Sequence, residues 1–322
     1  MSKHSSQPSA HSAAESTRQR RPLRVLMTWR PDSPGDESAQ VVAWLARTEQ
    51  LSVRSATVIS RTWSEQPGSQ EHTAYQRWLS KETQACADAS ARALHDAGLP
   101  GSMVDAETPA MVSVDHSETQ QLITSAKDFG ADAMVIGSHP SAPRGQFRIG
   151  STADALLHCS PYPLLLAPKA PRLSKRGVTR VNCCYVDTDQ SHQALRNAAD
   201  LAARWNVPLR LVAFTPRGAT MYPTQVRFDS SSDMMVEWRE QALALLDRGR
   251  DRALARHSHL TVETATGSGY GWSGAINALK WKKGDLLVMG SSTLGEFNRV
   301  FIGPSTNQIL RHSQVPVLIS PV

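Results

Sequence analysis

One block of this chain occurs twice. Residues 132–168 read DAMVIGSHPSAPRGQFRIGSTADALLHCSPYPLLLAP, and residues 285–321 read DLLVMGSSTLGEFNRVFIGPSTNQILRHSQVPVLISP. The two segments align at a constant offset of 153 without a gap, and eleven of the 37 aligned positions are identical. The identical pairs include Gly137 with Gly290 and Gly150 with Gly303. So many matches at one offset predict two copies of a single domain, each ending in the same strand–loop–helix–strand unit.

The length agrees with this interpretation, because 322 residues suffice for two domains of ordinary size. We expect a first domain at 22–170, a linker at 171–177 (PRLSKRG) and a second domain at 178–322. Residues 1–21 are rich in serine and lack the apolar stretch of a signal peptide, so we expect a disordered tail there.

Composition narrows the class of protein. With 40% hydrophobic and 20% charged residues, the chain is typical of a soluble globular protein, and no apolar run reaches membrane-spanning length. The net charge of +6 is a mild basic bias without a dense Lys/Arg cluster interleaved with aromatics, so we expect no nucleic-acid partner and no membrane association. The four cysteines form no C-x-x-C pair, which favours a reducing, cytoplasmic setting.

Short apolar runs alternate with helical patterns in both halves. Strands are expected at 23–29, 52–59, 110–115, 132–137 and 162–168, and again at 181–187, 208–214, 260–266, 285–290 and 315–321. Helices are expected between them, for example at 75–97, 119–129, 151–158, 191–205, 235–255 and 275–282. This alternation predicts parallel sheets with helices on both faces, an α/β fold. The long loops 61–72 and 216–233 suggest no particular role.

The repeated block has the pattern of a phosphate-binding turn. In the first copy a strand ends at Gly137, and Gly150 and Ser151 open a helix after a loop. Glycine permits close backbone approach to a ligand, the first turn of a helix offers free N–H groups, and serine adds a hydroxyl. An ordinary strand-to-helix turn with an N-cap explains the same residues equally well.

The block resembles the nucleotide-binding motif of the universal stress protein family, G-x2-G-x9-G-(S/T), over residues 23–322. Gly137, Gly150 and Ser151 match it in the first copy, and Gly290 and Gly303 match it in the second. The resemblance implies two tandem doubly wound domains with five-stranded parallel sheets of order 3-2-1-4-5. It also implies that the fifth strands, YPLLLAP and VPVLISP, pair across a pseudo-two-fold interface within the chain. Whether two whole chains form a homodimer is left open.

The motif is incomplete in both copies. Pro140 and Thr293 occupy the second glycine position, and Pro304 follows Gly303, where Ser305 could partly replace the lost hydroxyl. Proline has no N–H to donate to a phosphate.

The family also places an aspartate after the first strand, where it contacts adenosine. Asp187 matches it, whereas the first copy has Trp29-Arg30 there. Asp187 and Gly290 should converge at the switch point of the second sheet, where open α/β sheets bind ligands. In the first copy, Arg144 and Arg148 either assist phosphate binding or belong to a solvated loop.

Three functions are compatible with these features of the sequence. The first is a cytoplasmic stress-response regulator that binds ATP or another adenine nucleotide. The second is a scaffold of the same family that has lost nucleotide binding and acts through protein partners. The third is an ATP-consuming enzyme, which we do not expect because no general base or metal-binding carboxylate pair is apparent.

Two further motifs have simple explanations. GYGWSG (269–274) fits the dinucleotide fingerprint, yet it follows an expected edge strand, and the nearest following acidic residue, Asp285, comes only 11 positions after Gly274 rather than about 20, so a glycine-rich turn is expected. The basic run Lys280–Lys283 is interpreted as the solvated end of a helix, where the helix dipole favours positive charge.

Overall fold

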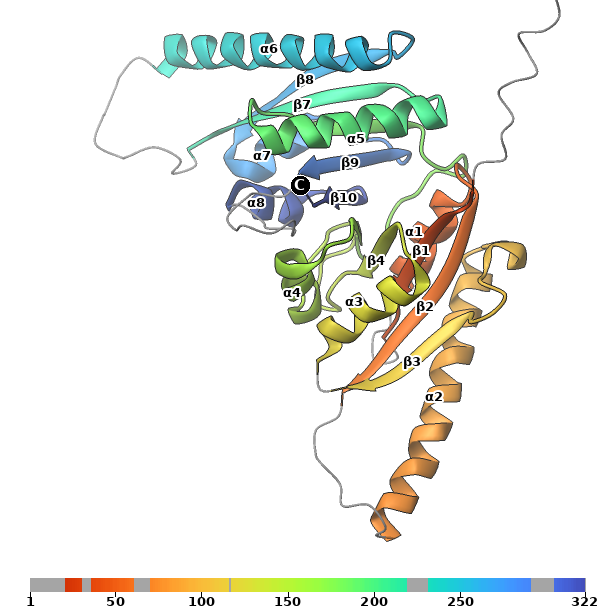
Figure 1. Ribbon diagram of the computed structural model, residues 1–322. Coiled ribbons are helices and arrows are strands. Elements are labelled where there is room, and N and C mark those ends of the chain that lie inside the picture. Colours follow the sequence, from red (N-terminus) through yellow and green to blue (C-terminus); the bar gives the residue numbers. More distant parts are fainter. Residues whose placement is uncertain are drawn as a thin grey trace, which may run out of the picture.

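The computed structural model describes residues 21–30, 36–60, 70–115, 117–218, 231–290 and 304–321. The ten strands in these residues form one continuous sheet in the order β3-β2-β1-β4-β5-β10-β9-β6-β7-β8 (Figure 1). Its two five-stranded halves each have the order 3-2-1-4-5, with parallel pairing throughout each half. The predicted fold class and strand order are therefore confirmed.

Both halves alternate strands and helices along the chain. The first half contains β1 (Leu23–Thr28), α1 (Glu37–Leu45), β2 (Leu51–Ser60), α2 (Gln70–Asp96), a short 3-10 helix (Gly101–Met103), β3 (Ala110–Asp115), α3 (Glu118–Phe129), β4 (Ala133–Gly137), α4 (Ser151–Cys159) and β5 (Leu164–Ala167). The second half contains β6 (Arg180–Cys184), α5 (Asp189–Trp205), β7 (Leu209–Arg217), α6 (Ser231–Arg256), β8 (Val262–Tyr270), α7 (Gly271–Ala278), β9 (Asp285–Gly290), α8 (Pro304–His312) and β10 (Val317–Ser320).

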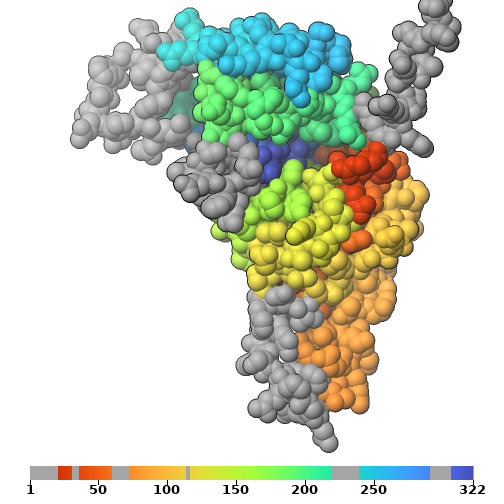
Figure 2. Space-filling view, in the orientation of Figure 1, coloured from red at the N-terminus to blue at the C-terminus, as the bar shows by residue number. Residues whose placement is uncertain are grey.

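The two halves join through their fifth strands. Residues 164–166 of β5 pair antiparallel with residues 317–319 of β10, as expected for an intramolecular pseudo-dimer. The pairing covers an edge that each half would otherwise expose. In the space-filling view the second half, green to blue, is in contact with the first half, red to yellow-green, along a broad seam (Figure 2).

Helices cover both faces of this sheet. Because side chains alternate along a strand, Val25 and Met27 pack on the face covered by α1, α2, α5 and α6, and Leu26 packs on the face covered by α3, α4, α7 and α8. Burial on both faces explains why the strands are continuous apolar runs. Among the described helices, none is long and apolar enough to cross a membrane.

The position of α7 explains the GYGWSG segment (269–274). β8 is the edge strand of the second half, as expected, and the GYGWSG segment passes from it directly into α7. A Cβ atom on Gly269 would lie 2.3 Å from the carbonyl carbon of Gly274, so this glycine permits α7 to pack closely on β8.

The interpretation of the basic run as a helix end was wrong. Helix α7 ends at Ala278, and its C-cap Leu279 is extended. Residues 280–283 therefore follow the helix and lie in the turn before β9, where Lys280, Lys282 and Lys283 are exposed to solvent as expected. The apolar and aromatic residues Leu279 and Trp281 had suggested a longer helix, but they pack from the turn onto the core instead.

Candidate functional site

The acidic residue of the second copy lies just beyond the carboxyl end of β6. Asp187 lies in the connection to α5, directly before the N-cap Thr188, whose hydroxyl accepts a hydrogen bond from the Ser191 amide at 3.3 Å. Strand β6 pairs with β7 on one side and with β9 on the other, so Asp187 lies at the switch point of this half-sheet.

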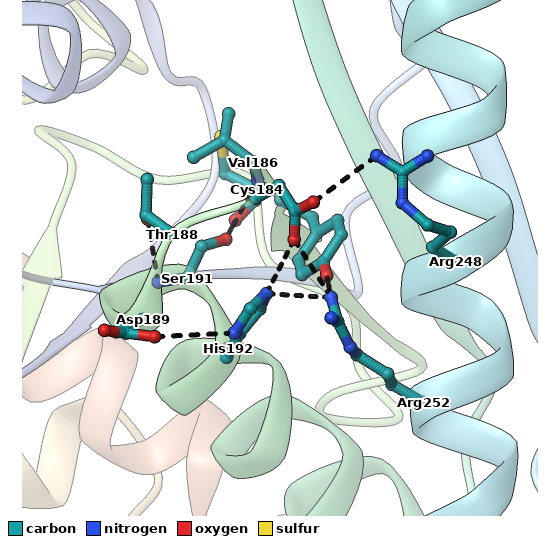
Figure 3. Close-up of polar contacts among 10 residues, drawn as sticks. Cys184, Val186, Thr188, Asp189, Ser191, His192, Arg248 and Arg252 are labelled. Atoms are coloured by element: carbon teal, nitrogen blue, oxygen red, sulfur yellow. Dashed lines mark hydrogen bonds and ion pairs between the residues drawn. The ribbon is translucent and has the colours of Figure 1, made fainter.

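The Asp187 carboxylate contacts three side chains that are labelled in Figure 3, those of His192, Arg248 and Arg252. His192 of α5 donates from Nε2 to Oδ1 at 2.9 Å, and Arg252 of α6 donates from Nη1 to the same oxygen at 3.1 Å. Arg248, one turn earlier on α6, donates to Oδ2 at 3.4 Å. The hydrogen bonds from His192 and Arg252 lower the pKa of Asp187 to about 2, so the carboxylate is ionised at physiological pH.

The same cluster links helices α5 and α6. Arg252 also donates to the hydroxyl of Tyr185, a buried residue directly after β6. The Asp187 side chain nevertheless keeps 44% of its surface exposed, which leaves part of the carboxylate open to an incoming hydrogen-bond donor.

Gly290 ends β9 and lies against the first turn of α5. A Cβ atom there would lie 2.5 Å from the backbone oxygen of Gln190, so the close approach of α5 accounts for this glycine. Asp187 and Gly290 therefore both adjoin the start of α5. Gly303 and Thr293 lie outside the described residues; Ser305 lies in the first turn of α8, and its side chain is outside the description.

In the first copy, two of the predicted residues meet at a small cavity. Gly137 and Gly150 line a cavity of about 60 Å³ at the carboxyl ends of β1 and β4, together with Trp29, Glu37 and Ser38. Trp29 and Glu37 are buried, and Ser38 Oγ would lie 3.0 Å from a Cβ atom on Gly137. The remaining space holds about two water molecules, whereas ligand pockets usually measure roughly 300–1,000 Å³.

The other candidates of the first copy face elsewhere. Ser151 and Arg148 line a neighbouring hollow, and Arg148 donates to Ser141 Oγ at 3.0 Å. Arg144 lines a third hollow at the junction of the two halves. None of these three residues is among the described lining of the Gly137 crevice, although the Arg148 amide donates to Oγ of Ser138, which does line it, at 2.8 Å.

Comparison with known proteins identifies the family. The sequence profile described as "Universal stress protein family" matches residues 24–168 and again 177–321. Universal stress protein Rv2319c of Mycobacterium tuberculosis is 32% identical over 299 residues, which cover 93% of this chain and all of that protein. The chain belongs to the universal stress protein family. Universal stress protein Mb2346c of Mycobacterium bovis matches to the same extent.

A solved universal stress protein supports the fold. The crystal structure from Archaeoglobus fulgidus DSM 4304 matches with a TM-score of 0.59 and 16% identity, covering 92% of this chain and 98% of that one. Membership of the universal stress protein family supports a role in the stress response.

Sequence reasoning missed the partners of the universal stress protein aspartate. Arg248 and Arg252 are more than 60 positions from Asp187 along the chain, and their placement depends on how α6 packs against α5. Their i, i+4 spacing on one helix face was the available signal, because such residues can address one common group. His192 had no comparable signal.

The sequence analysis also did not identify Glu37, which lines the small cavity of the first copy. Its burial there can be tested through the pH dependence of stability. Burial raises its pKa, partly offset by the backbone N–H groups of Glu37 and Ser138. Because the folded pKa exceeds the unfolded one, ionisation of Glu37 disfavours the folded state as the pH rises. Glu37→Gln should therefore increase the free energy of unfolding relative to wild type near pH 7, and this gain should shrink towards about pH 4.

Urea denaturation across this pH range measures the effect, with the exposed Glu107→Gln as control. A gain that is the same at every pH would contradict the assignment.

Proposed function

We propose that this universal stress protein is a cytoplasmic stress-response regulator that binds one adenine nucleotide, at the switch point of its second copy. The observation that supports this most directly is the ionised, half-exposed carboxylate of Asp187 beyond the end of β6. An ionised carboxylate at this position can accept hydrogen bonds from the hydroxyl or amino groups of an adenosine.

The first copy serves as a structural partner in this proposal. Its crevice of about 60 Å³ is too small for an adenosine, which supports a stoichiometry of one nucleotide per chain. Through the β5–β10 pairing it provides the surface against which the second copy is held.

The cluster around Asp187 suggests how binding is transmitted. His192 belongs to α5, and Arg248 and Arg252 belong to α6. A bound nucleotide that hydrogen-bonds to these side chains, or displaces them from Asp187, changes how α6 is held against the rest of the second half. Binding then shifts the population of α6 positions, which a protein partner can recognise.

The alternative is a scaffold that binds no nucleotide in either copy. The specific observation in its favour is that three side chains already satisfy the Asp187 carboxylate, so a ligand must compete with them. Both proposals involve binding without turnover.

Calorimetric titration with ATP tests the proposal. The wild-type chain should bind one ATP, and Asp187→Ala should weaken binding about tenfold or more, because a hydrogen bond to a charged group contributes roughly 1.5–3 kcal/mol. The matched control is Asp200→Ala, since Asp200 is equally exposed at 44% and joins α5 to Arg256 and His257 at the end of α6. The control should bind ATP as wild type does.

Other results of this titration would support the scaffold or contradict the proposed position of the site. Absence of binding by a folded wild-type chain supports the scaffold. Two bound nucleotides, or equal losses in the Asp187 and Asp200 variants, would contradict a single site at the second switch point.

A further inference from the structure

A basic hollow lies where the two halves meet, away from the Asp187 site. It measures about 580 Å³ and is lined by residues 144–146 of the first half, 170–172 of the connecting segment, and 281–283 and 314–315 of the second half. Among the described lining residues, four side chains are cationic and none is a carboxylate; the cations are Arg144, Arg172, Lys282 and Lys283. The hollow therefore exists only because the two halves and their connection are packed together.

Backbone hydrogen bonds hold the three segments in place. The Gly145 amide donates to the Lys169 oxygen at 2.6 Å, and the Lys169 amide donates to the Gln146 oxygen at 3.0 Å. On the other side, the Ser174 amide donates to the Lys283 oxygen at 2.9 Å. The positive charges are thus attached to a fixed backbone frame rather than to independent loops.

These charges lack acidic partners within the described part of the chain. Other arginines of the protein pair with carboxylates, as Arg180 does with Asp285 and Arg256 with Asp200, but none of the ion pairs there includes the four cations of the hollow. Asp285 accepts a hydrogen bond from the Lys282 amide, yet its side chain is fully buried. Clustered, exposed charges of one sign repel one another and attract anions.

An adjoining hollow extends the positive surface. It shares Gln146 with the first hollow, measures about 740 Å³, and adds Arg148, Arg311 and His312. The one carboxylate among its described lining residues, Asp154, lies 3.9 Å from His158. An elongated anion could therefore follow the junction from one hollow into the other.

We propose that this junction binds a short linear chain of phosphates, in the form of an inorganic polyphosphate. Arginine and lysine side chains match the charge of successive phosphates, and arginine can contact them bidentately. The hollow offers little for a nucleobase, because Trp281 is the only aromatic residue among its described lining residues. Its indole N–H donates to the Ile276 oxygen at 2.9 Å, and Arg210 lies over its ring at 5.1 Å.

Titration of the full chain with sodium tripolyphosphate tests this proposal. Binding should weaken at least about tenfold between roughly 50 and 200 mM salt, as expected for contacts between several charges. The double variant Lys282→Ala/Lys283→Ala should weaken binding about tenfold, because two of the four cations are lost. The matched control is Arg92→Ala/Lys127→Ala, which removes two exposed positive charges from α2 and α3, and it should change binding by less than about twofold.

Further titrations distinguish this site from the nucleotide site and from a nucleic-acid site. The Lys282/Lys283 variant should bind ATP as wild type does, and Asp187→Ala should bind tripolyphosphate as wild type does. Absence of tripolyphosphate binding at low salt, or equal losses in the double variant and its control, would overturn the proposal. An oligothymidylate that binds more tightly than a polyphosphate of matched charge would overturn the choice of ligand.

Discussion

Asp285→Ala should lower the free energy of unfolding by about 3–5 kcal/mol, the usual cost of removing one partner from a buried ion pair. Asp285 is fully buried, and its two oxygens accept hydrogen bonds from Nε and Nη2 of Arg180, each at 2.8 Å. Arg210, also buried, lies 3.7 Å from the same carboxylate. Removing the carboxylate deprives the buried Arg210 of its ion-pair partner and leaves Arg180 with only the half-exposed Glu263, 3.6 Å away.

The repeat itself supplies the control for this prediction. Asp132 occupies the equivalent position of the first half, but its side chain is 24% exposed and its ion-pair partner is the exposed Arg21. Asp132→Ala should therefore cost less than about 1.5 kcal/mol, the sum of a weak surface pair and one hydrogen bond from the Arg24 amide. Urea denaturation followed by circular dichroism measures both variants. If Asp285→Ala and Asp132→Ala lowered the free energy of unfolding by similar amounts, the conclusion that only the second half contains a buried charge cluster at this position would be contradicted.

Trp44→Ala should have a comparable effect, about 3–5 kcal/mol, because it leaves a large cavity in the core. Trp44 lies on α1, is fully buried, and packs on the face of the sheet that α1, α2, α5 and α6 cover. Its indole Nε1 has no hydrogen-bond partner within the described residues. Trp44→Phe keeps most of the packing and removes this unsatisfied donor, so we expect it to cost less than about 1.5 kcal/mol.

The control for Trp44 is another tryptophan at the surface. Trp78 on α2 is 49% exposed, and Trp78→Ala should change the stability by less than about 1 kcal/mol. Thermal and urea denaturation of the three variants give the comparison. If the phenylalanine and alanine variants of Trp44 were equally unstable, the indole would have an essential polar contact, contrary to the structure.

Much of the architecture could be derived from residues close together in the sequence. The repeat at a constant offset indicated two equal domains, and apolar runs alternating with helical patterns indicated parallel half-sheets, because the periods of strands and helices are local properties. The resemblance to universal stress proteins then supplied the strand order and the pairing of the fifth strands, which the β5–β10 ladder confirms.

The candidate sites depended on contacts between distant segments. Packing within each half places Arg248 and Arg252 at Asp187 and places Trp29 and Glu37 in the first crevice. Packing of one half on the other places Lys282 and Lys283 in one hollow with Arg144 and Arg172. Local patterns determine which elements form, since backbone preferences and apolar periodicity act within a few residues. Which side chains meet, and whether a carboxylate or cation there is buried, paired or left exposed, is determined only when those elements pack.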